Sequence, residues 1–309
     1  MNTHKLSRRI TPLSMLFIFL WATNPSAIGQ NIYRTPAQEA EAVISRFTHG
    51  DMNVKVHIEP ASDNQPGYTF HTQADTLFIS ATSAVAACHG FYQWAKAKGC
   101  GICSWSGNRF VRPADISTPS TSAASPFRHH QYFNVVTYGY TMPYWDTLRW
   151  NQELDWMALH GIDQPLMLLA QEAIYRQVFL SLGLTEKEID AWEVGPAHLP
   201  WMRMGNISGN SFDGPLGKDW HQQQLSLAQY VIQRMRQLGM EPICPAFCGF
   251  VPSALADHFD VELDTPQAGT GCRPRAATTA SDPIPRFLPK SAVVSSSAGN
   301  SILARAPII

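Results

Sequence analysis

The sequence has little charge. Charged residues make up 15% of it, against about 25% in an average soluble domain, and its formal net charge at pH 7 is −1. Without a basic excess, the chain has no electrostatic attraction for nucleic acid or for an anionic membrane surface, so neither is expected as a partner. Its most apolar stretch, Leu13–Trp21, is too short to span a bilayer as a helix.

Motifs for a bound metal are also missing. No spacing such as H-E-x-x-H links the histidines of the central region, which are His129, His130, His198 and His221. Cys100 and Cys103 form a lone C-x-x-C, which predicts a local disulfide or two unreactive thiols rather than a redox pair or half a metal site. The cysteines expected to be small buried residues are Cys88, Cys244 and Cys248. No metal and no cofactor is expected.

The first residues have the pattern of a leader. Arg8 and Arg9 belong to a basic start, the short apolar stretch follows, and a small-x-small site ends at Gly29. This pattern predicts a signal peptide over residues 1–29. The mature protein is therefore expected to be exported, to the periplasm or to the extracellular space.

Residues 30–118 predict a small α+β domain. Its expected helices are Glu39–Phe47 and Ser83–Lys98, and its expected strands are Val54–Ile58, Tyr68–His71 and Thr76–Ser80. Residues 119–126 are rich in Ser, Thr, Ala and Pro and predict a linker.

Residues 127–264 predict successive strand–helix units. The expected elements are strand Tyr132–Val136, helix Asp146–His160, strand Pro165–Leu169, helix Trp220–Leu238 and strand Pro242–Phe247. Repeated units with buried strands indicate a parallel sheet. A complete (β/α)8 TIM barrel needs about 250 residues, so this stretch predicts only the opening part of one. An insert at 185–219, which starts with a capping box at Thr185 and Glu188, is expected to serve the site.

Three acidic residues lie near the predicted strand ends and helix. Glu172 follows the second strand, and we expect it to order a loop or to cap a helix rather than to catalyse a reaction. Asp155 is expected to pair with Arg149 or Arg128, and Glu153 to be solvated.

After residue 264 the composition changes. Residues 265–309 contain many Pro, Ala, Ser and Thr and show no helix or strand period, which predicts a disordered tail or an out-of-frame translation.

Five motifs carry a resemblance to a known family. They are NVVTYGYTMPYWDTLRWNQELDWMALHGI, QEAIYRQVFLSLGLT, GPAHLPWMRMGN, DGPL and LGMEPICPAFCGFVP. In this order they resemble the alpha-N-acetylglucosaminidases of glycoside hydrolase family 89. The resemblance implies hydrolysis of terminal alpha-linked N-acetylglucosamine with retention, and a glycan that contains this sugar as the partner. It does not indicate an oligomeric state.

The resemblance also implies roles for particular residues. Asn134, Tyr140, Trp201 and Met204 match positions that the family uses to hold the sugar. Both family catalytic residues are glutamates on later strands, one of them after an Asn, and this sequence has no Asn-Glu dipeptide. No catalytic residue is carried over, and the chain as given is expected to be truncated and inactive. Two departures affect specificity, namely Val136, where some relatives carry Cys, and Phe250, where many carry His.

Two alternatives stay open at this point. One is a non-catalytic carbohydrate-binding pseudoenzyme, and the other is a different retaining hexosaminidase with a similar leading domain. Tyr138 and Tyr140 have the simpler interpretation of packing residues.

Overall fold

The structure is a computed structural model that describes residues 34–61, 65–247 and 249–259. The predicted signal peptide at 1–29 and the predicted tail at 265–309 lie outside these residues. The described residues from Thr35 onward belong to one compact unit.

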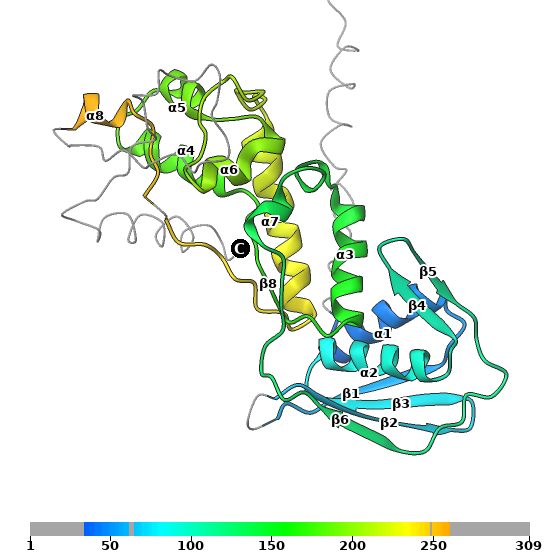
Figure 1. Ribbon diagram of the computed structural model, residues 1–309. Coiled ribbons are helices and arrows are strands. Elements are labelled where there is room, and N and C mark those ends of the chain that lie inside the picture. Colours follow the sequence, from blue (N-terminus) through cyan, green and yellow to red (C-terminus); the bar gives the residue numbers. More distant parts are fainter. Residues whose placement is uncertain (1–33, 62–64, 248, 260–309) are drawn as a thin grey trace, which may run out of the picture. The chain divides into compact units, whose positions relative to one another are not determined.

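The leading part is a four-stranded sheet with two helices on one face (Figure 1). The strand order is β1-β3-β2-β6, in which β1 and β3 are parallel and β2 is antiparallel to both its neighbours. The elements are α1 (Pro36–Thr48), β1 (Val54–Ile58), β2 (Gly67–Gln73), β3 (Thr76–Ala81), α2 (Ala84–Ala97), the hairpin β4 (Gly101–Ser104) and β5 (Gly107–Phe110), and β6 (Thr121–Ala124). The helices and strands predicted in this part are therefore confirmed.

Local sequence explains these elements. The Thr35 hydroxyl accepts a hydrogen bond from the Gln38 backbone, and the Gln38 side chain accepts one from the Thr35 backbone, so α1 starts with a complete capping box. At the start of α2, the Ser83 hydroxyl accepts a hydrogen bond from the Ala86 backbone N–H. In β3 alternate side chains point to the helices, and Leu77 and Ile79 are buried there.

Residues 119–126, predicted to be a linker, instead contribute a strand. Thr121–Ala124 forms β6, which pairs with β2 through the register Gly67↔Ala124 to Phe70↔Thr121. All four side chains of β6 are exposed. An edge strand is held by backbone hydrogen bonds and needs no apolar face, so its composition of small residues resembles that of a linker.

Short parallel strands open the barrel part. β7 (Gln131–Tyr132) is parallel to β8 (Gln164–Pro165), and Leu166 forms a parallel bridge with Ile243. The Met167 N–H donates to the Ile243 carbonyl, and the Ile243 N–H donates to the Pro165 carbonyl, both at 2.9 Å. The predicted order of three parallel segments is confirmed, although each regular segment is shorter than predicted.

The first strand stops early for a local reason. The prediction extended it over Tyr132–Val136, but Phe133 has φ 72° and Asn134 begins the 3-10 helix η1 (Val135–Tyr138). The Asn134 side chain satisfies backbone N–H groups at the start of η1. An Asn side chain competes with the strand ladder in this way, and the apolar pattern of the stretch does not reveal it.

Two long helices flank these strands as predicted. α3 (Thr147–Leu159) is capped by Asp146 and α7 (Trp220–Gln237) ends before Gly239, which has φ 76°. The remaining elements are η2 (Met142–Tyr144), α4 (Gln171–Ser181), α5 (Glu186–Trp192), η3 (Pro196–His198), α6 (Leu199–Arg203) and α8 (Leu255–His258). Within the described ranges, no helix has both the length and the apolar content that a membrane crossing requires.

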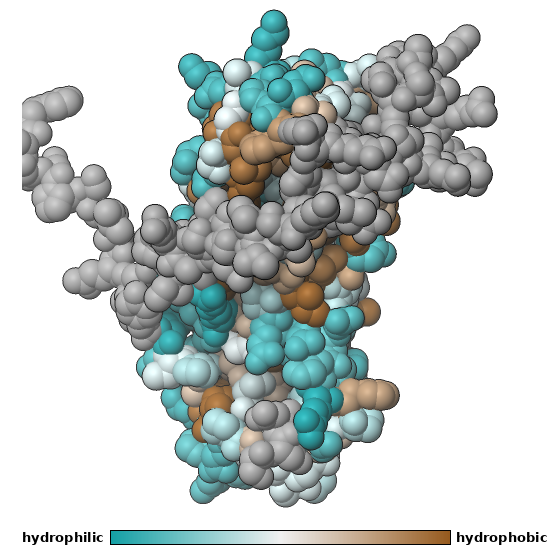
Figure 2. All heavy atoms as spheres, turned by 90° about the vertical axis from the view of Figure 1, so that its left-hand side faces the viewer, coloured by the Kyte–Doolittle hydropathy of each residue, from teal (hydrophilic) through white to brown (hydrophobic). Residues whose placement is uncertain are grey.

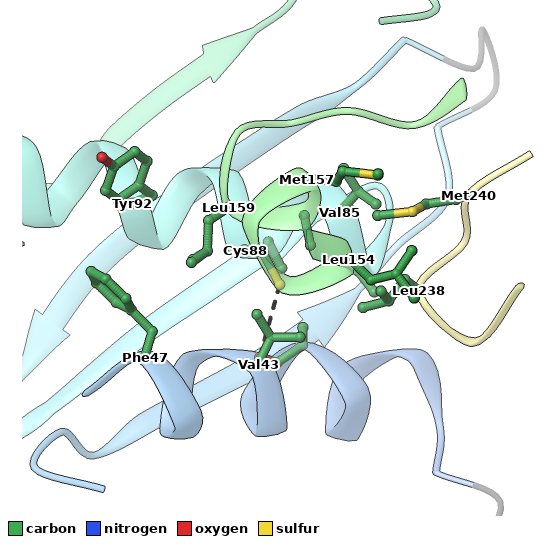
Figure 3. Packing of buried hydrophobic residues seen from close by; sticks show 14 of the residues in the cluster. Val43, Phe47, Val85, Cys88, Tyr92, Leu154, Met157, Leu159, Leu238 and Met240 are labelled. Carbon is green, nitrogen blue, oxygen red and sulfur yellow. Dashed lines mark hydrogen bonds between the residues drawn. The ribbon is translucent and has the colours of Figure 1, made fainter. Parts of the chain in front are cut away.

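The larger hydrophobic core joins the leading part to the barrel part. Figure 3 shows residues of this core from α1, α2, α3 and the end of α7, among them Val43, Val85, Leu154 and Leu238. The dashed line in Figure 3 starts at the thiol of Cys88, which donates to the Ala40 carbonyl at 3.9 Å. A second core, around α4, α5 and α6, holds the insert together. The two parts predicted from the sequence thus share one core.

Charged side chains cross the same junction. Arg46 of α1 bonds Asp155 of α3 through two nitrogens at 2.6 and 2.8 Å, and Arg234 of α7 pairs with Glu39 of α1. The expectation that Asp155 pairs with Arg149 or Arg128 is therefore wrong.

Glu153 also differs from the prediction. It is 1% exposed rather than solvated, and Arg149 donates to it at 2.8 Å. The helical period places Glu153 on the buried side, where a carboxylate requires a cation.

The described cysteines are thiols. Cys100 and Cys103 are not bonded to each other, and burial raises the pKa of Cys103 to about 11. They are therefore the unreactive thiols that the lone C-x-x-C allows. Cys88 is buried as expected, whereas Cys244 is exposed, and Cys248 lies outside the described residues.

Candidate functional site

The loop after β7 carries Asn134, the first predicted sugar contact. Its Oδ1 atom accepts hydrogen bonds from the backbone N–H groups of Val136 and Thr137 at 2.9 and 3.1 Å. Asn134 is exposed. With Oδ1 engaged, the amide NH2 is the group of this side chain that can donate to a ligand.

The two tyrosines of this loop behave differently. Tyr138 is 3% exposed and its hydroxyl donates to the Leu166 carbonyl, so it is the packing residue that the simpler interpretation predicts. Tyr140 is 66% exposed and has φ 57°. A non-glycine residue in the left-handed region costs about 1–3 kcal/mol and is often found at ligand sites.

Trp201 faces Tyr140 from another element. Trp201 belongs to α6, and its ring centroid lies 5.6 Å from that of Tyr140 with an interplanar angle of 89°. A Cβ atom added to Gly139 would lie 3.1 Å from the Trp201 ring and 3.2 Å from Pro200. The loop and α6 are thus in close contact, and two predicted sugar contacts meet although 61 residues separate them (201 minus 140).

Met204, the fourth predicted contact, lies at the C-cap of α6 and is partly buried. Gly205 follows it with φ 75°, and a Cβ atom there would overlap the Phe250 ring. Phe250 therefore packs directly on Gly205, next to Met204. A histidine at this position would place a polar ring where this chain has an apolar one.

Glu172 has a partner that sequence reasoning missed. Arg203, the last residue of α6, donates to both oxygens of Glu172 at 2.7 and 2.9 Å, and the two residues are 8% and 2% exposed. A carboxylate held in this way links α4 to α6, which agrees with the structural role expected for Glu172. A buried Glu requires a cation, so the sequence could have indicated that Glu172 has a positively charged partner. It could not have indicated that this partner is Arg203.

A second buried carboxylate, Glu193, lies at the end of α5. His221 contacts it at 2.7 Å and Arg176 at 3.7 Å. Burial is the main cause that raises the pKa of Glu193 above its usual range, and Glu172 adds to the increase. The sequence contains no spacing that pairs residues 193 and 221.

Exposed apolar side chains alone do not define the site. Figure 2 shows the side that faces left in Figure 1, where hydrophobic patches alternate with hydrophilic residues. Tyr144, Leu148 and Phe127 are as exposed as Tyr140, and single exposed apolar residues are normal. The contact with Trp201 distinguishes Tyr140. Over the residues that the structure describes, no group of three His, Cys, Asp or Glu side chains could hold a metal ion.

The parallel segments and the loops at the carboxyl ends of β7 and β8 place this part of the chain in the class of TIM-barrel proteins, in which loops at that end carry the site. Residues 130–278 match the model of the alpha-N-acetylglucosaminidase (NAGLU) TIM-barrel domain. This part of the chain belongs to the alpha-N-acetylglucosaminidase family, glycoside hydrolase family 89, and the family expected from the motifs is confirmed. The match extends beyond residue 264, where the sequence predicts the tail to begin.

Individual relatives agree. The chain is 39% identical over 211 residues to the alpha-N-acetylglucosaminidase of Homo sapiens. The aligned region covers 66% of this chain and 28% of the human protein. It is similar to a family 89 glycoside hydrolase from Clostridium perfringens, solved in complex with its substrate GlcNAc-alpha-1,4-galactose, with a TM-score of 0.68 and 24% identity. Another structure of this hydrolase, with 2-acetamido-1,2-dideoxynojirmycin, gives a TM-score of 0.66. Each covers 72% of this chain and 26% of the solved chain.

The chain thus spans between a quarter and a third of the length of the relatives that it matches. The solved structures, at 24% identity, support the fold of the opening barrel.

Proposed function

We propose that this chain forms the opening part of an exported alpha-N-acetylglucosaminidase. The substrate is a glycan that ends in alpha-linked N-acetylglucosamine, and the reaction is hydrolysis with retention. Asn134, Tyr140, Trp201 and Met204 form one wall of the sugar site.

One observation carries the proposal. Tyr140, in the loop that follows β7, and Trp201 of α6 meet edge to face within the segment that matches the family. Aromatic rings cover the apolar face of a sugar, and an amide group such as that of Asn134 donates to its hydroxyl or acetamido oxygens. The relatives indicate which sugar this is, since the substrate bound to the Clostridium perfringens hydrolase is GlcNAc-alpha-1,4-galactose.

The chemical step needs groups other than these. Retention requires two carboxyl groups about 5–5.5 Å apart, one as acid and base and one as nucleophile. Glu172 is engaged by Arg203 and Glu193 by His221, and neither matches a family catalytic glutamate. We therefore expect the 309-residue chain to bind the sugar without cleaving it.

Hydrolysis assays test this proposal. Nitrophenyl N-acetylglucosaminides with alpha and beta linkage are incubated with the purified chain, and the free sugar is titrated against it in parallel. Binding without cleavage of either substrate is the expected result. Cleavage of the alpha-linked substrate contradicts the proposed inactivity, and cleavage of the beta-linked one favours a different hexosaminidase.

Export is tested separately. The full chain and a chain that lacks residues 1–29 are expressed in bacteria, and the cell fractions are probed. The full chain is expected outside the cytoplasm and shortened at its N-terminus after Gly29. An uncleaved cytoplasmic product contradicts export.

A further inference from the structure

The ion pair of Glu172 and Arg203 includes a residue of α6 that stands between Trp201 and Met204 in the sequence. Arg203 donates through Nε at 2.7 Å and through Nη2 at 2.9 Å, one nitrogen to each carboxylate oxygen. This is the bidentate arrangement, which fixes orientation as well as distance. Both side chains are more than nine-tenths buried, so neither exchanges the partner for bulk water.

Arg203 belongs to a helix that requires an external anchor. α6 has five residues, no side-chain cap at its start, and Trp201 and Met204 within or next to it. A helix of this length is not stable by itself. Its orientation, and with it the orientation of Trp201, is therefore set by what α6 contacts.

Glu172 belongs to a better fixed element. It is in the first turn of α4, an eleven-residue helix that starts six positions after the end of β8, and a helix N-terminus favours a carboxylate. α6 in turn contacts the loop that carries Tyr140, since Trp201 faces Tyr140 and an added Cβ at Gly139 would lie 3.2 Å from Pro200. The ion pair thus connects α4 to the helix that packs on this loop.

We propose that Glu172 and Arg203 are positioning residues for sugar binding. The pair transmits the fixed position of α4 to α6 and so holds Trp201 against Tyr140. This inference rests on the proposed function, because it assigns to the pair the geometry of the proposed sugar wall. Neither residue contacts the sugar.

If the pair served stability alone, replacing both partners would not change sugar binding. Replacing both partners of a buried ion pair by apolar residues of similar volume is often neutral or stabilising, whereas removing one partner is destabilising. The double variant E172M/R203M therefore separates the two roles. It keeps a packed interior but loses the directional link between α4 and α6.

The experiment measures stability, the Trp201 environment and affinity in the same proteins. Thermal unfolding reports stability. The difference in tryptophan fluorescence and acrylamide quenching between each protein and its W201F counterpart isolates Trp201 from the other eight tryptophans. Titration with N-acetylglucosamine gives the affinity. The control is R176M/D190M, which removes a more exposed 2.6 Å pair between α4 and α5 that does not include α6. The buried Glu193, 3.7 Å from Arg176, keeps its contact with His221 in this variant.

We expect E172M/R203M to unfold at a temperature close to that of the wild type, with Trp201 more accessible to acrylamide and affinity about tenfold weaker. The control is expected to leave the Trp201 signal unchanged. Unchanged quenching and affinity in a folded E172M/R203M overturn the proposal. If this variant does not fold, R203K keeps the charge but loses the bidentate fork, and the same Trp201 readout decides. A wild type without sugar affinity contradicts the proposed function, while the Trp201 signal still tests the pair.

Discussion

Tyr140 and Trp201 stand edge to face, with their ring centroids 5.6 Å apart, at the point where a short loop meets a five-residue helix. Their positions in the sequence are far apart, and no backbone pairing joins them. Tyr140 belongs to the loop that also carries Asn134, where the family resemblance predicts contacts to the sugar.

Truncation of Tyr140 should weaken sugar binding. Aromatic contacts of this kind contribute about 0.5–1.5 kcal/mol beyond the buried area, so Y140A is expected to reduce the affinity for N-acetylglucosamine by up to about tenfold. Y140F keeps the ring and should lose less. Y144A removes another exposed tyrosine from the neighbouring η2 turn and serves as the control in calorimetric titrations. Equal effects of Y140A and Y144A would contradict the assignment.

The junction of α1 and α7 should depend on its buried ion pair. R234M leaves the carboxylate of Glu39, which is 2% exposed, with Arg46 at 4.0 Å. Breaking a buried pair costs about 3–5 kcal/mol of unfolding free energy. Because Arg46 remains near Glu39, we expect a loss at the lower end of this range. Urea unfolding measures the change. R236M, at an exposed position two residues further along α7, should have almost no effect, and a similar loss in both variants would argue against the pair.

Three glycines separate backbone strain from steric contact. Gly217 has open space around its added Cβ position, so G217A should be nearly neutral. Gly50 has open space but φ 80°, and G50A should lose about 1 kcal/mol from strain. G205A combines φ 75° with an overlap of the new methyl group with the Phe250 ring, and the loss should be the largest of the three. Thermal unfolding ranks the variants; any other order would show that Phe250 does not pack on Gly205.

The capping box of α5 predicts a pH dependence. Hydrogen bonds from the Thr185 backbone and hydroxyl lower the pKa of Glu188 from 4.5 to about 2, and His258 contributes. A carboxyl group whose pKa is lower in the folded state stabilises that state at any pH above its unfolded-state pKa. This stabilisation is lost as the pH falls through the folded-state pKa. The difference in unfolding free energy between wild type and E188Q should therefore be constant above pH 4.5 and shrink toward pH 2.

T185A removes the hydroxyl partner of Glu188 and should reproduce this pH window in urea unfolding. A difference that stays constant from neutral pH down through the acid range would show that the hydrogen bonds of the box do not favour the charged form.

The helices α3 and α7 and the start of α5 could be predicted because their information is local. The apolar spacing of α3 and α7 and the capping residues Asp146 and Thr185 all lie within or next to the elements that they define. β6 was missed because an exposed edge strand needs only backbone partners. The first barrel strand was predicted too long, since the competing hydrogen bonds of Asn134 are invisible in its apolar pattern.

The partners of the charged residues depended on tertiary contacts. Asp155 pairs with Arg46, which lies 109 positions earlier, and Glu172 with Arg203, which lies 31 positions later. Helical spacing shows which side of a helix is buried, but not which other element covers it. The sugar-contact roles of Asn134, Tyr140, Trp201 and Met204 came from the family resemblance and stay predictions, although the structure brings Tyr140 and Trp201 together.

The most direct test of the account is saturation-transfer NMR with the purified 309-residue chain and N-acetylglucosamine, with glucose as the matched sugar. We expect saturation transfer to the ring and acetyl protons of N-acetylglucosamine, weaker transfer to glucose, and loss of the N-acetylglucosamine signal in W201A. Equal signals for both sugars, or a signal that persists unchanged in W201A, would contradict the claim that this wall holds N-acetylglucosamine.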